Sequence, residues 1–394
     1  METNISALAE LQQLLRSSDK KPCEKKAFIG FDGFVDKIKK AVKEKQNTRT
    51  VYFDSIREFA DRILMASGKS GQIQMDTQHM KLGGNAPILS NTLGKLGIGS
   101  FCVGSMGYPD RHEIFSGISA ACETISVLEP GRSDAIEFND GKLIFSELEV
   151  FDQYNWSHVK RNAGLEKIKH AVAGSDLIAF VDWANLPHAS NIWEGILEEV
   201  IKPMHKRDFV FLFDLCDPSK KTTEQIDEVL DLISSFSTYG KVTLGLNENE
   251  TLKIWTALNG KDFVKDKEKL PPIAEAGDFL HKAMTIDSLL IHPIDRSIVY
   301  RQHETVELMG RLVTKPKVLT GGGDNLNAGF CLGLLCGFTL PQCMLLAMAA
   351  SGAYIENGIS PDRQDIIEYL DIWMKELENK EATLTKHVFA HRHE

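Results

Sequence analysis

The sequence predicts an α/β protein in which a central, mostly parallel sheet is flanked by helices. From residue 165 onward, helical and strand patterns alternate, with strands expected at 177–181, 209–213 and 241–246. Such alternation is typical of parallel strands joined by crossover helices. Polar turns also follow several of the apolar runs, at the carboxyl ends of strands where sheets of this class bind ligands. No repeat or low-complexity linker interrupts the pattern, so we expect a single domain over residues 1–394.

The elements before and after this alternation are less regular. The clearest hairpin is 135–145, where alternating runs flank an Asn-Asp-Gly turn. Further elements are a leading amphipathic helix within 1–26, a buried strand at 27–36 ending in a polar turn, a helix near 55–66, a helix that stops at Gly97, a strand at 100–104, helices at 165–173, 190–201 and 222–236, a strand pair at 288–292 and 297–300, and two C-terminal helices.

Composition limits the function and the compartment. The net charge is −10 over 394 residues, which disfavours a nucleic-acid backbone as a partner. The seven cysteines, including Cys23, show no metal-ligand spacing and indicate free thiols in a reducing compartment. The apolar stretch 326–350 is interrupted by Pro341 and glycines, which predicts two core helices instead of a membrane span. Residues 1–26 do not form a signal peptide pattern, so we expect a cytoplasmic protein.

The most informative segment is a glycine loop that runs into an apolar helix. Gly321, Gly322 and Gly323 are followed at once by Asp324. Glycines let the backbone approach a ligand, and a helix N-terminus offers free N–H groups to a phosphate. A carboxylate there is reasonable if it takes a proton from a hydroxyl that attacks a phosphoryl group. The alternative is a tight turn in which Asp324 only caps the helix.

Two further segments could bind a polyol. Gly83, Gly84 and Asn85 open a helix, and the Asn amide could bind hydroxyl groups or simply cap that helix. Asp32 and Asp36 follow a buried strand and could hydrogen-bond to sugar hydroxyls or serve as turn residues. A GxGxxG pattern does not follow the first strand, which disfavours a dinucleotide-binding dehydrogenase.

Another segment could bind a metal ion. Asn247 and Glu250 follow a strand and offer hard oxygen ligands, which suit Mg²⁺. The alternative is an N-cap with acids in the first helical turn, which the helix dipole favours by itself.

Taken together and in this order, these segments resemble the ribokinase-like (PfkB) carbohydrate kinase superfamily. Residues 83–97 are similar to its first signature, and 103–107 to the strand that follows it. Asn247-x-x-Glu250 resembles its NxxE motif, and 320–324 its second signature. The resemblance implies a three-layer ribokinase-like fold with a small β-sheet lid, drawn from about 37–82 and 130–156. It also implies a kinase that phosphorylates a hydroxyl of a sugar or similar small polyol.

The resemblance further implies roles for individual residues. Asp324 would be the general base, and the amides of Gly321 to Asp324 would form the anion hole. Asn247 and Glu250 would organise Mg²⁺ through water. The remaining assignments are substrate binding by Asp32, Asp36, Gly83, Gly84 and Asn85, and nucleotide or phosphate binding by Asn247, Glu250, Thr320 and Asn327.

The phosphoryl donor and the substrate stay open at this point. The second signature begins with Val318-Leu319, and His292 to Arg296 replaces the usual Gly-x-x-Gly loop on the nucleotide side. Partial similarity to the ADP-dependent sugar kinases, including 30–36 and 245–250, makes ADP an alternative, and we favour ATP. A nucleoside kinase and a catalytically silent sugar or nucleotide sensor also stay open as functions. A homodimer that pairs through the lid is a further expectation to test.

Overall fold

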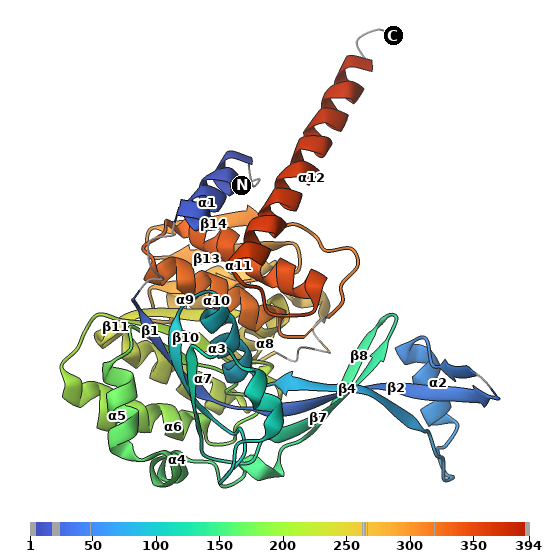
Figure 1. Cartoon of the computed structure of the whole chain (residues 1–394), viewed down its shortest axis with the longest axis horizontal. Helices are drawn as coiled ribbons and strands as arrows, with labels where there is room; N and C mark the ends of the chain where they lie inside the picture. The colour runs from blue at the N-terminus through green and yellow to red at the C-terminus, as the bar shows by residue number, and fades with distance from the viewer. Residues whose placement is uncertain are drawn as a thin grey trace.

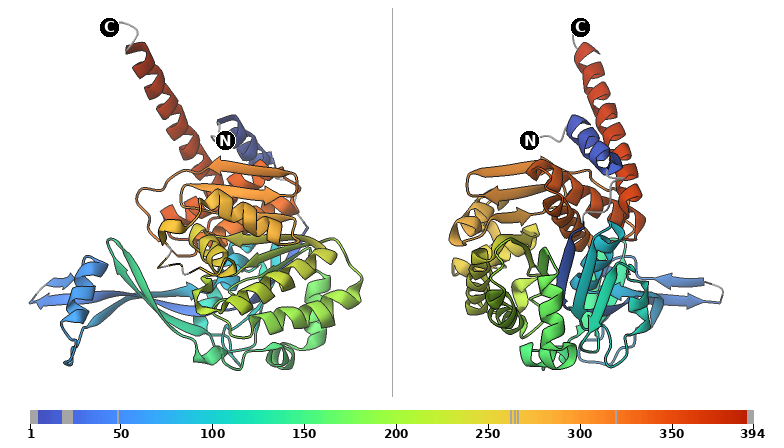
Figure 2. Two further views of the ribbon diagram at one scale, coloured as in Figure 1. Left: turned by 180° about the vertical axis from the view of Figure 1, so that it is seen from behind. Right: turned by 60° about the vertical axis from the view of Figure 1, so that its left-hand side comes forward.

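The computed structural model describes residues 5–17, 24–47, 49–261, 263, 265, 267–318 and 320–390, with side chains to residue 379 except that of residue 267. Cys23 and Leu319 lie outside this part. A nine-stranded sheet forms the centre (Figures 1 and 2). Its strands are, in spatial order, β14 (Glu304–Met309), β13 (Arg296–Arg301), β12 (Ser288–Ile291), β11 (Gly240–Leu246), β10 (Phe209–Asp214), β9 (Leu177–Phe180), β1 (Lys26–Phe31), β5 (Gly99–Gly104) and β6 (Cys122–Ser126). The strands from β12 to β6 are parallel, and β13 and β14 continue antiparallel.

Helices cover both faces of this sheet, which gives the three predicted layers. Alternate residues of the strands point to opposite faces, so Phe28 packs in one core cluster and Ile29 in the other. The first face carries α4 (Trp156–Ala163), α5 (Leu165–Ala173), α6 (Ala189–Ile196), α7 (Thr223–Ser235), α8 (Glu248–Leu258) and α9 (Ile273–Ala283). The second carries α1 (Ile5–Ser17), α3 (Asn85–Lys95), α10 (Gly322–Leu335), α11 (Leu340–Asn357) and the base of α12 (Arg363–Ala390), whose far end projects from the body (Figure 1).

A second, smaller sheet extends sideways from the body (Figures 1 and 2). Its strands follow the order β3-β2-β7-β8, and β4 also pairs with β2. We call this sheet and its helix the lid: β2 (Phe34–Gln46), β3 (Arg49–Tyr52), α2 (Ile56–Leu64), β4 (Met75–Gly83), β7 (Gly131–Phe138) and β8 (Gly141–Glu147). Ala41, Phe53, Phe59 and Ile136 give it a small core of its own.

Most elements predicted from the sequence are confirmed, within one or two residues. The hairpin is present as β7 and β8, with Phe138 paired to Gly141. The stretch 326–350 forms the buried helices α10 and α11, and the described part of the chain has no helix long and apolar enough to cross a membrane. Two details were wrong. Asp36 lies inside β2 instead of in a turn, and the helix expected at 190–201 is α-helical only to Ile196, then continues as a π-helical turn.

The contact between α10 and α11 holds the glycine loop in place and gives the first prediction. A Cβ at Gly329 would lie 2.7 Å from the carbonyl oxygen of Leu346, so Gly329→Ala must push the two helices apart. We expect a loss of about 1–3 kcal/mol in the free energy of unfolding, measured by urea denaturation, because overpacked cores cost this much. Gly117→Ala is the control, since nothing lies within 4 Å of the position that its Cβ would take. Equal stability of the two variants would contradict this account of the interface.

Candidate active site

Acidic side chains gather where four neighbouring parallel strands end. Asp32 follows β1, Asp182 follows β9 by one residue, and Asp214 is the last residue of β10. Asn247 comes directly after β11. All four strands run in the same direction, so their carboxyl ends meet at one edge. The polar turns predicted from the sequence therefore lie together.

The glycine loop faces this edge at the start of α10. Gly321 has a φ of +88° and precedes the first helical residue, Gly322. The Tyr354 hydroxyl donates a hydrogen bond to the Thr320 carbonyl at 2.9 Å and lies 2.8 Å from where a Gly321 Cβ would be. A side chain is therefore excluded, and the first N–H groups of α10 point out of the helix as a site for an anion.

Asp324 lies in the first turn of α10 and does not cap it, because the N-cap position belongs to Gly321. Its side chain is 5% exposed, and its Oδ1 has no hydrogen-bond partner among the described residues. Burial raises the pKa of Asp324 well above its usual value, the negative charges of Asp214, Asp32 and Asp182 raise it further, and a hydrogen bond from the Asn85 side chain lowers it. Because burial and neighbouring charges disfavour the ionised form, a carboxyl group in this environment binds its proton more strongly than an exposed aspartate does.

Asp32 anchors the helix that carries Asn85. Its two carboxylate oxygens accept the backbone N–H groups of Asn85 and Ala86 at 2.6 and 2.8 Å. Burial nevertheless raises the pKa of Asp32 to about 7. Gly84, with a φ of +94°, has its missing Cβ 2.8 Å from the Asp32 carboxylate. Asp32 therefore fixes the backbone at the end of the Gly83-Gly84-Asn85 segment through these two hydrogen bonds.

Asp36 projects from the lid toward the same place. It accepts a hydrogen bond from the Ser133 hydroxyl at 2.5 Å, and a Cβ at Gly83 would collide with its carboxyl group at 2.5 Å. Burial raises the pKa of Asp36, while the Ser133 hydrogen bond and the charges of Lys81 and Lys142 lower it. Gly83 thus leaves the space that the Asp36 side chain needs.

Asn247 and Glu250 form a capping box at the start of α8. The Glu250 carboxylate accepts the Asn247 backbone N–H at 2.9 Å and its side-chain amide at 2.6 Å, and Asn247 Oδ1 accepts the Glu250 N–H at 2.9 Å. Burial, reinforced by Asp214, raises the pKa of Glu250 to about 8. Nearby, the Asn327 amide donates to Asp214 at 2.8 Å. The helix-capping alternative is therefore correct for Asn247, and the pair still presents a buried acid at the site.

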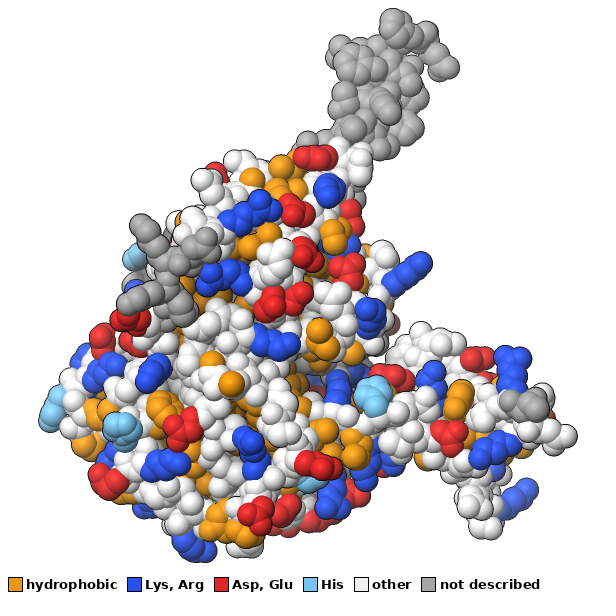
Figure 3. Space-filling view, viewed as in Figure 1, with side chains coloured by type: hydrophobic (Ala, Val, Ile, Leu, Met, Phe, Trp, Pro, Cys, Tyr) orange, Lys and Arg blue, Asp and Glu red, His pale blue; other side chains and the backbone are white. Residues whose placement is uncertain are grey.

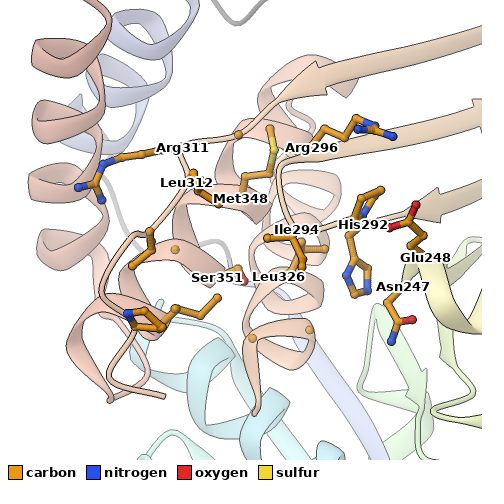
Figure 4. Close-up of a pocket in the computed structure, with 18 of the residues that line it drawn as sticks. Asn247, Glu248, His292, Ile294, Arg296, Arg311, Leu312, Leu326, Met348 and Ser351 are labelled. Carbon is orange, nitrogen blue, oxygen red and sulfur yellow. The ribbon is translucent and has the colours of Figure 1, made fainter. Parts of the chain in front are cut away.

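A pocket of about 570 Å³ is lined in part by Gly321, Gly322 and Gly323 of the glycine loop. This volume lies within the usual range for small-molecule sites, about 300–1,000 Å³. Figure 4 shows His292 and Asn247 on one side of the pocket and Leu326, Met348 and Ser351 of α10 and α11 on the other. Burial lowers the pKa of His292 to about 4, so its ring is neutral. The segment that replaces the Gly-x-x-Gly loop therefore lines this pocket as His292, Pro293, Ile294 and Arg296.

Comparison with known proteins decides the family. The family model described as prokaryotic ketohexokinase matches residues 7–373. The chain belongs to this family. A ketohexokinase of Haloferax volcanii is 21% identical over 347 residues, which cover 86% of this chain and 89% of that protein. Both belong with the PfkB carbohydrate kinases that the sequence resembles, so the chain is a carbohydrate kinase.

Solved structures support the ribokinase-like fold. Arabidopsis thaliana ribokinase complexed with ribose and ATP has a TM-score of 0.58 and 14% identity, covering 89% of this chain and 99% of that one. A putative ribokinase II of E. coli in complex with ATP and Mg²⁺ has a TM-score of 0.58 and 12% identity, covering 88% and 99%. The adenosine kinase of Sinorhizobium meliloti has a TM-score of 0.56 and 18% identity, covering 84% and 94%.

In this member of the ketohexokinase family, the structure also brings residues to the candidate site that the sequence did not single out. Tyr354 holds the Thr320 carbonyl, and Ser133 holds Asp36. Lys81, on β4, lies with its Nζ 3.4 Å from the Thr320 hydroxyl. These contacts join residues 34 to 239 positions apart in the chain, which local spacing cannot reveal.

The donor groups fit a magnesium ion that is held mainly by water. Among the side chains that the structure describes, no group of three or more His, Cys, Asp or Glu could hold a metal ion directly. Mg²⁺ usually keeps several waters and uses only one or two carboxylates. Burial raises the pKa of Glu250, and the negative charge of the neighbouring Asp214 raises it further. A cation beside this pair would relieve that repulsion.

The high pKa of Glu250 predicts how stability varies with pH. Between the ordinary pKa of 4.5 and about 8, the folded state keeps a proton that the unfolded state has released. The wild type therefore loses stability as the pH rises through this range. Glu250→Gln removes this titration, so its melting temperature should fall less between pH 5 and pH 8, without nucleotide or metal.

Glu248→Gln is the matched control, because Glu248 is exposed in the same helical turn. It should follow the wild-type slope, as Asp32 and the other buried acids remain in all three proteins. Parallel melting curves for the wild type and Glu250→Gln would show that Glu250 is not a source of this pH dependence.

Proposed function

We propose that this protein transfers the terminal phosphoryl group of ATP to a hydroxyl of a ketohexose, with Asp324 as the general base. One observation carries the proposal. Asp324, whose buried Oδ1 has no partner in the described part of the chain, directly follows the glycine loop that lines a nucleotide-sized pocket, and its side chain accepts a hydrogen bond from Asn85 beside the lid. The family and the name of the Haloferax relative supply the ketohexose.

The proposed reaction needs only one proton acceptor from the protein. The substrate oxygen attacks the terminal phosphorus of ATP, the bond from that phosphorus to the leaving ADP oxygen breaks, and the hydroxyl proton goes to Asp324. The amides of Gly322 and Gly323 at the start of α10 stabilise the charge on the phosphoryl oxygens. Burial raises the pKa of Asp324 and the neighbouring carboxylates raise it further, so the ionised form of Asp324 is a stronger base than an exposed aspartate.

The acceptor would lie on the lid side of Asp324. Asn85 reaches Asp324 from the start of α3, and Asp36 faces the same space from β2. Gly83 and Gly84 leave room for the sugar next to these side chains. Figure 3 shows a hollow between the lid and the C-terminal part of the body, with Lys or Arg side chains at its base. Closing such a hollow around the sugar excludes water, which protects the phosphoryl group from hydrolysis.

The donor would lie in the pocket beyond the loop. Leu312, Val313 and Ile355 provide apolar walls suited to a nucleotide base. Asn247 and Glu250 would hold Mg²⁺ through water, and this ion would neutralise phosphate charge. Thr320 and Asn327 lie close to the phosphate path, and Asn327 Oδ1 lacks a partner in the described part of the chain. ATP is favoured over ADP because related folds are known with ATP bound.

Replacing the base tests the mechanism. We expect Asp324→Asn to lower kcat by roughly 10²–10⁴-fold, because the variant cannot accept the hydroxyl proton. Its dissociation constant for the ketohexose, measured by calorimetry, should stay near that of the wild type. Asp61→Asn, an exposed change on α2, is the control and should leave kcat unchanged.

The assay should pair a panel of D-fructose, aldohexoses and nucleosides with ATP and ADP as donors. A near wild-type kcat for Asp324→Asn would refute its role as the base. Preference for ADP or for a nucleoside would correct the donor or the acceptor. Wild-type protein that binds a sugar yet never phosphorylates it would instead indicate a sensor.

A further inference from the structure

The glycine loop is surrounded by buried acidic side chains. Asp214, Asp32 and Asp182 lie close enough to Asp324 to raise its pKa, and Glu250 lies close enough to Asp214 for that carboxylate to raise the pKa of Glu250. None of these groups can offset the charge of a phosphate. A triphosphate and a phosphoryl group in transfer bring negative charge to the same place. Transfer at a useful rate therefore requires positive charge close to the phosphoryl oxygens.

The arginines that line the donor pocket cannot supply this charge. Arg311 is paired with Glu356 at 2.9 Å and with Glu376 at 2.8 Å. Arg296 is paired with Asp295 at 3.1 Å and with Glu307 at 3.0 Å. His292, next to Gly323, is neutral because burial lowers its pKa to about 4. A side-chain cation that acts beside the proposed Mg²⁺ must therefore come from outside this pocket lining.

Lys81 reaches the loop from the lid. It lies on β4 directly opposite Asp36 of β2, so both side chains share the lid face that looks toward the loop. Its Nζ is 3.4 Å from the Thr320 hydroxyl, a long contact with a neutral group. Among the residues that the structure describes, no carboxylate pairs with Lys81 within 4.0 Å. An ammonium group has three donors, so most of its hydrogen-bonding capacity is unused.

Lys142 adds a second positive charge near Lys81. It lies on β8 and is half-buried, and within the described ranges it too has no ion pair. Burial and the charge of Lys81 lower its pKa to about 8, while Glu137 and Asp36 raise it. Asp36 already accepts the Ser133 hydroxyl. The ammonium groups of Lys81 and Lys142 therefore both lie near Asp36, the carboxylate on the acceptor side. This face of the lid carries positive charge that an anion could neutralise.

We propose that Lys81 is a catalytic residue: its ammonium moves from the Thr320 hydroxyl to the phosphoryl oxygens during transfer. This deepens the proposed function and rests on it. Lys81 then makes the site complete only when the lid is in place, because the glycine loop lies in the body and the lysine in the lid. The strongest alternative is that the two lysines bind a phosphate already present on the acceptor.

Lys81→Met tests the proposal with Lys37→Met as the matched control. Lys37 is on β2 next to Asp36 but points to the opposite lid face, and it is also half-buried. We expect Lys81→Met to lower kcat for the ketohexose roughly 10²-fold, as for the loss of one donor to a developing charge, with little change in KM. Lys81→Arg should recover part of the loss, and Lys37→Met should match the wild type. Melting temperatures verify that each variant is folded.

Each outcome supports or overturns the role of Lys81. Activity of Lys81→Met equal to that of Lys37→Met would overturn the proposal while leaving the proposed function intact. A rise in KM alone, or wild-type activity on a hexose phosphate that Lys81→Met loses, would instead assign the lysines to acceptor binding and also overturn it. If the wild type phosphorylates no sugar, the proposed function fails. Calorimetry with the β,γ-imido analogue of ATP then decides about Lys81: weaker binding by Lys81→Met supports the contact, and equal binding refutes it.

Discussion

Burial of several carboxylates at one edge of the sheet is the constraint on which the rest of this site depends. Asp32, Asp182 and Asp214 follow parallel strands, so the fold places them together whatever their roles. Removing a charge from water is costly, and here it raises the pKa of each group. Keeping these groups ionised in the folded state therefore costs stability as the pH rises through neutrality. Clusters of buried acids with raised pKa values are a feature of functional sites, where such groups exchange protons with a substrate.

The same hydrogen bonds stabilise helices and position the candidate site. Asp32 satisfies the first amides of α3, and in doing so it fixes Asn85 beside Asp324. The capping box of α8 likewise fixes Asn247 and Glu250 at the end of β11. A structural interpretation of these residues and a functional one are therefore compatible. For such residues, loss of activity alone is weak evidence of a chemical role, because a substitution also disturbs the helix.

Local patterns in the sequence revealed the sheet better than they revealed the lid. Strands β10 and β11 were predicted nearly to the residue, because their continuous apolar runs fit a strand buried on both faces. Asp36 was predicted to lie in a turn, because its charge interrupts the apolar run that ends at Val35. In the structure, β2 continues for ten residues beyond Asp36. The glycine loop was recognised because its signal is contiguous. Lys81 was not, since it meets Thr320 only through the pairing of β4 with β2.

The body and the lid contribute different parts of the proposed reaction. The body holds Asp324, the glycine loop and the donor pocket on helices and strands packed into two large cores. Among the described residues, the lid's own core cluster consists of four buried apolar residues, far fewer than either cluster of the body, so the lid can change position at less cost in packing. In the proposed reaction the body supplies the base and the anion site, whereas the lid supplies Asp36 for the acceptor and Lys81 for the phosphoryl oxygens. Divergence of substrate within this fold should accordingly concentrate in lid positions around Asp36, while a lysine at position 81 should be retained where the chemistry is retained.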